Sequence, residues 1–323
     1  MSSDYIPRLR RELLRAGATE PSRWAPAARG LRPLAAAAAV ALFAVALVLA
    51  IPWGDNEQPS RPPDTPPSTL QLTYRGEPSS AADSARVMRE RLAAAGVRDA
   101  SVSAAAGGSL TITVPAAARA DVAALVRSGR FAVYDWERSV LGPRGTPAPD
   151  DADVTGNPDA GRSATTTKSV AEGRAARAEG GRAVRALSVA PGGWFALGGS
   201  PALTNADIRR VRADVDPATK EPIVALDLTA AGGKAFAALT RDVARRGSAN
   251  AVPGSGIESA QHFAIVVDDR IVSVPFIDFR QTPDGLDGPE GMQIQDDLTP
   301  ATARRLAALL SAGPLAAGLE REG

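Results

Sequence analysis

An uninterrupted apolar run at residues 34–51 divides this 323-residue chain into a short basic tail and a long remainder. The run contains eighteen residues and no charged or polar side chain. A helix of that length covers roughly 27 Å at about 1.5 Å of rise per residue, close to the hydrocarbon thickness of a bilayer. We therefore predict one transmembrane helix over residues 34–53, with Trp53 at the membrane interface.

The charges around this run predict its orientation. Seven arginines and three carboxylates precede it, which gives the tail a charge of +4, whereas the whole chain carries only +1. The positive-inside rule then places residues 1–33 in the cytoplasm and the bulk of the chain outside the cell membrane. The alternative is a cleaved signal peptide, because residues 48–50 have the small-residue character of a cleavage site. The long preceding tail and the length of the run favour an uncleaved anchor.

Composition limits the chemistry of the remainder. The chain has no cysteine, which excludes disulfides, thiolate metal sites, a lipidated cysteine and a cysteine nucleophile. The part after the tail carries −3 and is a poor partner for nucleic acid. Residues 54–69 are rich in proline and polar residues, so we expect a semi-rigid linker between the membrane and the folded part.

Residues 70–138 show periodicities that change in a definite order. Apolar residues alternate at 70–74, follow helical spacing at 85–95 and alternate again at 110–114, after a short strand around Val102. A second short helix at 122–126 and a strand at 131–135 complete the set. The order βαββαβ predicts a ferredoxin-like subdomain and an α+β fold class.

The rest of the chain divides into two predicted segments. Residues 139–200 are rich in small residues and predict a partly ordered excursion with one helix at 168–179. Residues 201–323 predict a second α+β subdomain, with strands at 223–228, 263–267 and 271–274 and a helix at 235–243. A final helix is predicted after Thr299 as N-cap, with Pro300 in its first turn.

Residues 261–278 read Gln-His-Phe-Ala-Ile-Val-Val-Asp-Asp-Arg-Ile-Val-Ser-Val-Pro-Phe-Ile-Asp and resemble a strand pair of SecD, the accessory subunit of the Sec protein translocase. The segment 222–229 with Gly232 and Phe236, and the segment 306–315, are similar to the neighbouring strand and helices of that family. The resemblance implies a head-type extracytoplasmic subdomain at 201–323. SecD continues into further transmembrane helices, but this sequence shows no second hydrophobic span. We therefore expect a single-pass SecD-like protein that lacks this later transmembrane bundle. Asp296-Asp297 replaces a glycine pair of the family.

Catalytic and metal-binding motifs are poor. His262 is the only histidine and has no nucleophile-elbow motif beside it, so a packed or edge histidine is the favoured interpretation. Asp151 and Asp153 imitate half of a calcium loop, but Arg162 stands where the bidentate glutamate belongs. Gly232-Gly233-Lys234 lacks the residues of a phosphate loop. We expect no enzymatic activity, no cofactor and no metal.

Two segments are candidates for binding. The strands at 263–267 and 271–277 are nearly continuously apolar, which favours the interior of a sheet. If one of them lies at an exposed edge, it could pair with an extended polypeptide. The candidate contact residues are then Phe263, Ile265, Val267, Ile271 and Val274. In the tail, Ile6, Leu9, Leu13 and Ala16 share a helical face, which serves either as a topology signal or as a docking helix.

These observations predict a single-pass membrane protein whose outer domain binds unfolded or emerging polypeptide, beside the Sec channel and in support of protein export. The alternative is a membrane-anchored sensor in which the arginine-rich tail docks a cytoplasmic regulator.

Overall fold

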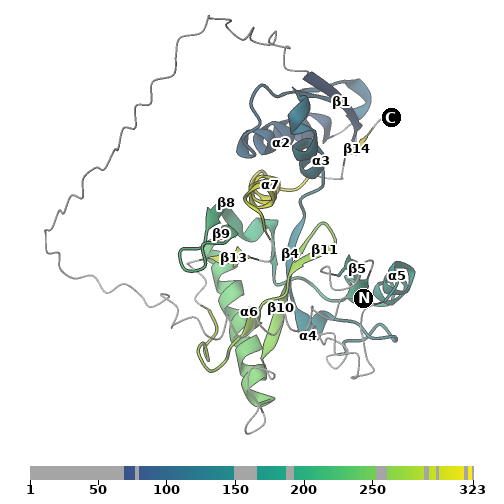
Figure 1. Ribbon diagram of the computed structural model, residues 1–323. Coiled ribbons are helices and arrows are strands. Elements are labelled where there is room, and N and C mark those ends of the chain that lie inside the picture. Colours follow the sequence, from purple (N-terminus) through teal and green to yellow (C-terminus); the bar gives the residue numbers. More distant parts are fainter. Residues whose placement is uncertain are drawn as a thin grey trace, which may run out of the picture. The chain divides into compact units, whose positions relative to one another are not determined.

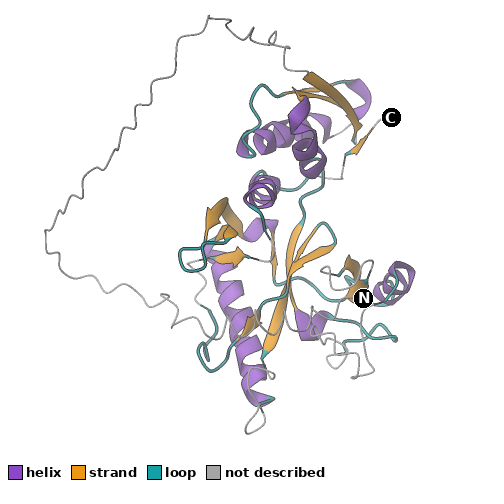
Figure 2. Cartoon of the chain, in the orientation of Figure 1, coloured by secondary structure: helices purple, strands orange, loops and turns teal. Residues whose placement is uncertain are grey.

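The computed structural model describes residues 69–76, 80–148, 166–186, 193–251, 260–286, 291–295, 298–315 and 319–321 (Figure 1, Figure 2). No helix within these ranges is long and apolar enough to cross a membrane. The predicted tail and the predicted span at 34–53 lie outside the described residues, as does the predicted linker except for Thr69.

Four strands form a first antiparallel sheet in the order β14-β1-β3-β2. They are β1 (Thr69–Arg75), β2 (Ser101–Ala104), β3 (Ser109–Pro115) and β14 (Glu320–Arg321). The predicted alternation holds, because Leu72, Leu110 and Ile112 are buried. The helices α2 (Ala81–Ala94) and α3 (Arg119–Leu125) bury the apolar stripes that their helical spacing predicts, and α2 contacts both β2 and β3.

The strand predicted to complete this sheet lies elsewhere. Strand β4 (Phe131–Asp135) pairs with β10 and β7 in a second sheet. Phe131 and Val133 belong to one hydrophobic cluster and Tyr134 belongs to another, so both faces of β4 are apolar. Such a strand requires a sheet that is covered on both sides. The α+β class is thus confirmed, whereas the prediction that β4 completes a ferredoxin-like βαββαβ sheet is wrong. Strand β14 takes the place beside β1.

The second sheet has the strand order β6-β5-β11-β10-β4-β7, and β12 also pairs with β10. Its other strands are β5 (Arg182–Arg185), β6 (Trp194–Leu197), β7 (Leu203–Thr204), β10 (Gln261–Val267), β11 (Arg270–Ser273) and β12 (Phe276–Ile277). The helix α4 (Trp136–Ser139) contacts β10, and α5 (Lys168–Ala175) contacts β5 and β6. The helix predicted at 168–179 begins as expected, and the excursion contributes two strands to this sheet.

A third sheet has the order β13-β9-β8. It contains β8 (Ile208–Val215), β9 (Pro222–Leu228) and β13 (Met292–Ile294), and α7 (Pro300–Ser311) packs against β8 and β9. The N-cap hydroxyl of Thr299 accepts the amide of Thr302 at 3.1 Å, with Pro300 in the first turn as predicted. The helix α6 (Ala230–Ala249) is capped by Thr229 and packs against β10. Short 3-10 turns lie at Ala106–Gly108, Ala116–Ala118 and Asn205–Asp207.

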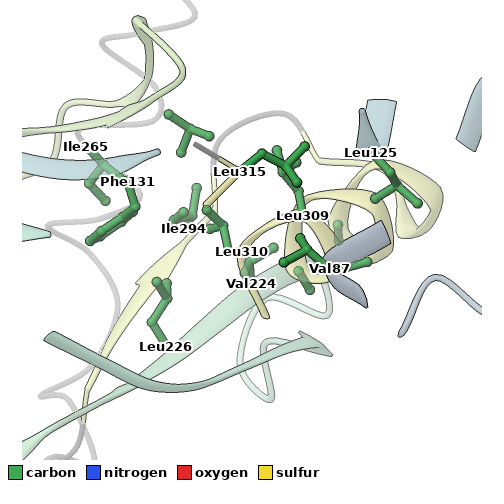
Figure 3. Close-up of a cluster of buried hydrophobic side chains, with 14 of the residues drawn as sticks. Val87, Leu125, Phe131, Val224, Leu226, Ile265, Ile294, Leu309, Leu310 and Leu315 are labelled. Carbon is green, nitrogen blue, oxygen red and sulfur yellow. The ribbon is translucent and has the colours of Figure 1, made fainter. Parts of the chain in front are cut away.

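The largest hydrophobic core joins all three sheets. Helix α7 is central to it, because Ala303, Ala307, Ala308, Leu309 and Leu310 are all buried. Figure 3 shows side chains of α7 gathered with residues from α2, β4, β9, β10 and β13. A smaller cluster around Trp136, Phe195 and Val266 fills the opposite side of β10.

Candidate functional site

The predicted polypeptide-contact residues lie in the interior of the second sheet. Phe263, Ile265, Val267 and Ile271 are no more than 4% exposed, and Val274 is half-buried. Strand β10 pairs with β4 along one edge and with β11 and β12 along the other. Strand β10 therefore lies in the interior of its sheet, as the sequence favours. An added polypeptide strand would have to displace β11, so a different edge is the better candidate.

Strand β8 offers that edge. It has eight residues and is the last strand of its sheet, whereas the edge strands β2, β6, β7, β13 and β14 have two to four residues each. Its inner edge pairs with β9 from Ile208 to Val215, with one bulge between Ile208 and Arg210. Beyond the bulge the register is regular. Within the described part of the chain, β8 thus presents the longest strand edge without a partner strand.

The register shows which main-chain groups of β8 point outward. The amide of Asp216 donates to the oxygen of Glu221 at 2.9 Å, so this pair is of the hydrogen-bonded type. Antiparallel pairs alternate between the hydrogen-bonded and the non-hydrogen-bonded type. Val215, Ala213 and Val211 are therefore non-hydrogen-bonded with β9, which agrees with Pro222 opposite Val215 having no N–H. The outward amide of Val215 donates to the carboxylate of Asp214 at 2.8 Å, while those of Val211 and Ala213 lie further along the edge.

The two faces of β8 have different chemistry. Val211, Ala213 and Val215 share a face with the buried β9 residues Val224 and Leu226. Val215 is nevertheless 53% exposed. Among the described residues, Val170 is the only other large hydrophobic residue that is exposed. The apolar row therefore runs from Val211, which packs against the main core, to Val215, which is open to solvent.

The opposite face of β8 is charged, because Arg210 and Arg212 share it with Asp214, which lies 3.5 Å from Arg212. Arg212 pairs with Asp227 at 2.7 Å, and Arg209 lies 3.9 Å from the same carboxylate. Arg210 forms no ion pair within the described ranges. A charged face also discourages unwanted strand pairing, which is a common role for arginine on edge strands. The two faces of this edge thus differ, one apolar and the other charged.

His262 occupies a polar cluster at the start of β10. Its Nδ1 lies 2.7 Å from Oε1 of Glu137, and its amide donates to both oxygens of the same carboxylate at 3.1 Å. Arg246 of α6 links Asp135 and Gln261, each at 2.7 Å. These contacts join α4, α6 and β10, and they agree with the packed histidine that the sequence favours.

Other predicted motifs have structural explanations or lie outside the described residues. Gly232 is buried at the start of α6, where a Cβ atom would lie 2.6 Å from the oxygen of Asp207, so close packing explains this glycine. Residues 151–162, which imitate a calcium loop, are not among the described residues. Within the residues that are described, no group of three or more histidine, aspartate or glutamate side chains is placed to hold a metal ion.

Sequence reasoning missed β8. Its residues read Ile-Arg-Arg-Val-Arg-Ala-Asp-Val, so three arginines conceal a weak alternation of Val211, Ala213 and Val215. The detectable signal was this alternation immediately before the stronger strand at 222–228.

The structure defines a mixed α+β domain with several sheets and an open strand edge. Residues 183–317 match the family model of the SecDF P1 head subdomain, which covers β8, β9, α6, β10, β11 and α7. Residues 183–317 are therefore similar to this head subdomain, and the resemblance to SecD seen in the sequence is confirmed over this range.

Two solved structures align with most of the chain. A crystal structure of SecDF in a super-membrane-facing form has 19% identity and a TM-score of 0.48, and the alignment covers 79% of this chain and 29% of that one. A structure of SecDF, described as a membrane component that enhances protein export, has 18% identity and a TM-score of 0.46, with coverage of 79% and 98%. This chain thus spans less than a third of the length of the first SecDF chain. No curated protein matches it.

Proposed function

We propose that this protein acts in protein export by binding unfolded or emerging polypeptide on the outer side of the cell membrane. The match of residues 183–317 to the SecDF P1 head subdomain supports the link to export. SecDF itself is described as a membrane component that enhances protein export. The family match favours this role over the sensor alternative.

The observation that carries polypeptide binding is the free edge of β8. A polypeptide in transit is extended, so its main-chain N–H and C=O groups are available for pairing. An exposed strand edge binds such a segment through main-chain hydrogen bonds, which do not depend on sequence, while adjacent side chains add selectivity. At β8 the outward groups of Val211 and Ala213 supply the hydrogen bonds, and Val215 supplies an apolar contact.

The remaining parts of the proposal come from the sequence. Residues 34–53 form a single membrane span, residues 1–33 stay in the cytoplasm, and residues 54–69 hold the domain away from the bilayer. The protein then acts beside Sec channel subunits, by binding and not by catalysis, without a cofactor or a metal.

Site-specific crosslinking tests this function. A photoreactive residue replaces Val215 in one variant of the full chain and Val170 in a matched control, because these valines are 53% and 45% exposed and lie on different elements. We expect crosslinks from position 215 to secreted chains during export, and few from position 170. Equal yields at both positions, or none to secreted chains at either, would contradict the proposal.

A further inference from the structure

Two arginines face each other across neighbouring strands of the second sheet. Arg185 of β5 and Arg270 of β11 are directly paired in a parallel register. Directly opposed residues project to the same face of a sheet, and like charges in such pairs are destabilising. Val184 and Ile271, their chain neighbours, are buried on the opposite face. Both arginines are exposed, so this face of the sheet ends in a pair of adjacent cations.

A third arginine adds to this charge. Burial lowers the pKa of Arg270, and the charges of Arg127 and Arg185 lower it further. Arg127 follows α3 and donates weakly to the oxygen of Val267, just before the turn that joins β10 and β11. Arg127 and Arg185 thus approach Arg270 from two other parts of the chain, the segment after α3 and strand β5.

The nearby carboxylates are already committed to other partners. Asp268 accepts a hydrogen bond from the amide of Arg130 at 2.9 Å and lies 3.2 Å from Nε of Arg127. Asp269 pairs with Arg130 at 3.1 Å and with Arg182 at 2.5 Å. The carboxylates of Asp268 and Asp269 therefore pair with Arg127, Arg130 and Arg182. Arg185 and Arg270 form no ion pair among the residues that the structure describes. Residues 186–193, which follow Arg185, contain no charged side chain.

We propose that Arg127, Arg185 and Arg270 form a binding site for a phosphate group. Guanidinium groups present forked N–H donors that match phosphate oxygens in pairs, and such charge-assisted hydrogen bonds are among the strongest available. Five arginines (127, 130, 182, 185 and 270) and two carboxylates lie around the Asp268-Asp269 turn, which leaves an excess of three positive charges. This excess fits the charge of a phosphate better than that of a single carboxylate. Free phosphate and a phospholipid headgroup share this chemistry.

The site is independent of the proposed polypeptide-binding edge. It lies on β5, β11 and the segment after α3, whereas β8 belongs to a different sheet. Loss of phosphate binding would leave the proposal for β8 intact, and failure of β8 to bind polypeptide would not affect the phosphate site.

Titration of the purified full-length protein with inorganic phosphate at low ionic strength tests this inference. We expect saturable binding that the variant R185Q/R270Q weakens by about tenfold or more, because two charge-assisted contacts are lost. The control R89Q/R98Q removes two exposed arginines elsewhere and should bind like the wild type. If the glutamine variant unfolds, R185K/R270K keeps both charges but loses the forked geometry, and we expect it to bind more weakly than the wild type.

Soluble lipids distinguish the two sources of phosphate. Short-chain, water-soluble phosphatidylcholine and phosphatidylglycerol are titrated into the same variants, because vesicles would also bind the proposed membrane span. Binding of phosphatidylglycerol that requires Arg185 and Arg270 assigns the site to a lipid headgroup, whereas binding of inorganic phosphate alone assigns it to free phosphate. The inference is overturned if neither ligand binds, or if R185Q/R270Q binds both as well as the wild type does. Preferential binding of polyglutamate would also overturn it, because the site would then belong to an acidic polypeptide.

Discussion

The guanidinium group of Arg91 donates a 2.7 Å hydrogen bond to the main-chain oxygen of Gly313, 222 positions later in the chain. The same side chain is fully buried and also donates to the oxygens of Leu125, Arg127 and Ser128. These acceptors lie where α3 and α7 end, and helix C-termini carry partial negative charge. Burial lowers the pKa of Arg91 to about 10, while the more distant charge of Asp268 raises it. One arginine thus connects α2 with the ends of two other helices.

Substitution of Arg91 by methionine should strongly reduce the free energy of unfolding. Four main-chain oxygens lose their donor in a buried site, and we expect a cost of about 3–5 kcal/mol. The control R89M changes an exposed arginine on the same helix and should cost less than about 0.5 kcal/mol. Urea denaturation of the three proteins measures the difference. Similar losses in R91M and R89M would show that the Arg91 contacts add little stability.

Gly129 tests the packing around the same guanidinium group. It has a φ of +74°, and a Cβ atom there would lie 2.4 Å from Nη2 of Arg91 and 3.0 Å from the oxygen of Leu309. G96A is the matched control, because Gly96 has a φ of +78° and open space around it. Both variants should lose about 1 kcal/mol from backbone strain, and G129A should lose more because Arg91 must move. Equal unfolding midpoints for the two variants would contradict this account of the site.

Asp135 gives the fold a pH dependence. Burial raises the pKa of Asp135 above its ordinary value of 3.8, and Arg246, 2.7 Å away, opposes the rise only in part. Between 3.8 and the raised pKa the folded chain binds more protons than the unfolded chain, so the free energy of unfolding falls as pH rises through that window. D135N should flatten this part of the profile, and R246M should steepen it. A D135N profile as steep as that of the wild type would assign the dependence to another group.

Glu137 should stabilise the start of β10. E137A leaves the amide of His262 without its carboxylate acceptor in a site where Glu137 is only 11% exposed, so we expect a cost of about 2–3 kcal/mol. E137Q retains an oxygen acceptor and should cost less. The control E90A breaks the ion pair between Glu90 and Arg86. These side chains are 48% and 55% exposed, so the change should cost under about 0.5 kcal/mol. Thermal unfolding ranks the variants, and an E137A midpoint equal to that of E90A would argue against the contact.

Local sequence patterns predicted the elements that depend on local physics. The alternation of Leu72 with Tyr74, the helical stripe of α2 and the Thr299 cap of α7 each follow from a few neighbouring residues. The SecD resemblance likewise came from short matching strands and helices. The mixed α+β class followed from the order of these elements.

Features that depend on distant partners were missed. The sequence pattern gave Phe131 and Val133 one buried face, but it did not show that Tyr134 also requires cover on the other face. Strand β14 has two residues, too few for any periodicity, and exists because β1 offers an edge. Strand β8 was concealed by Arg209, Arg210 and Arg212, which lie on a solvated edge. The candidate binding edge was therefore assigned first to β10, whose apolar residues give the stronger pattern.

Residue-resolved amide hydrogen exchange of β8 tests the central claim most directly. The full-length protein is measured alone and with a peptide of alternating valine and threonine flanked by glutamates, which suits the apolar and charged faces of the edge. We predict that the outward amides of Val211 and Ala213 slow by about tenfold or more on binding, while those of Arg212 and Asp214, already paired with β9, change little. Bound peptide with unchanged exchange at Val211 and Ala213 would contradict pairing at β8.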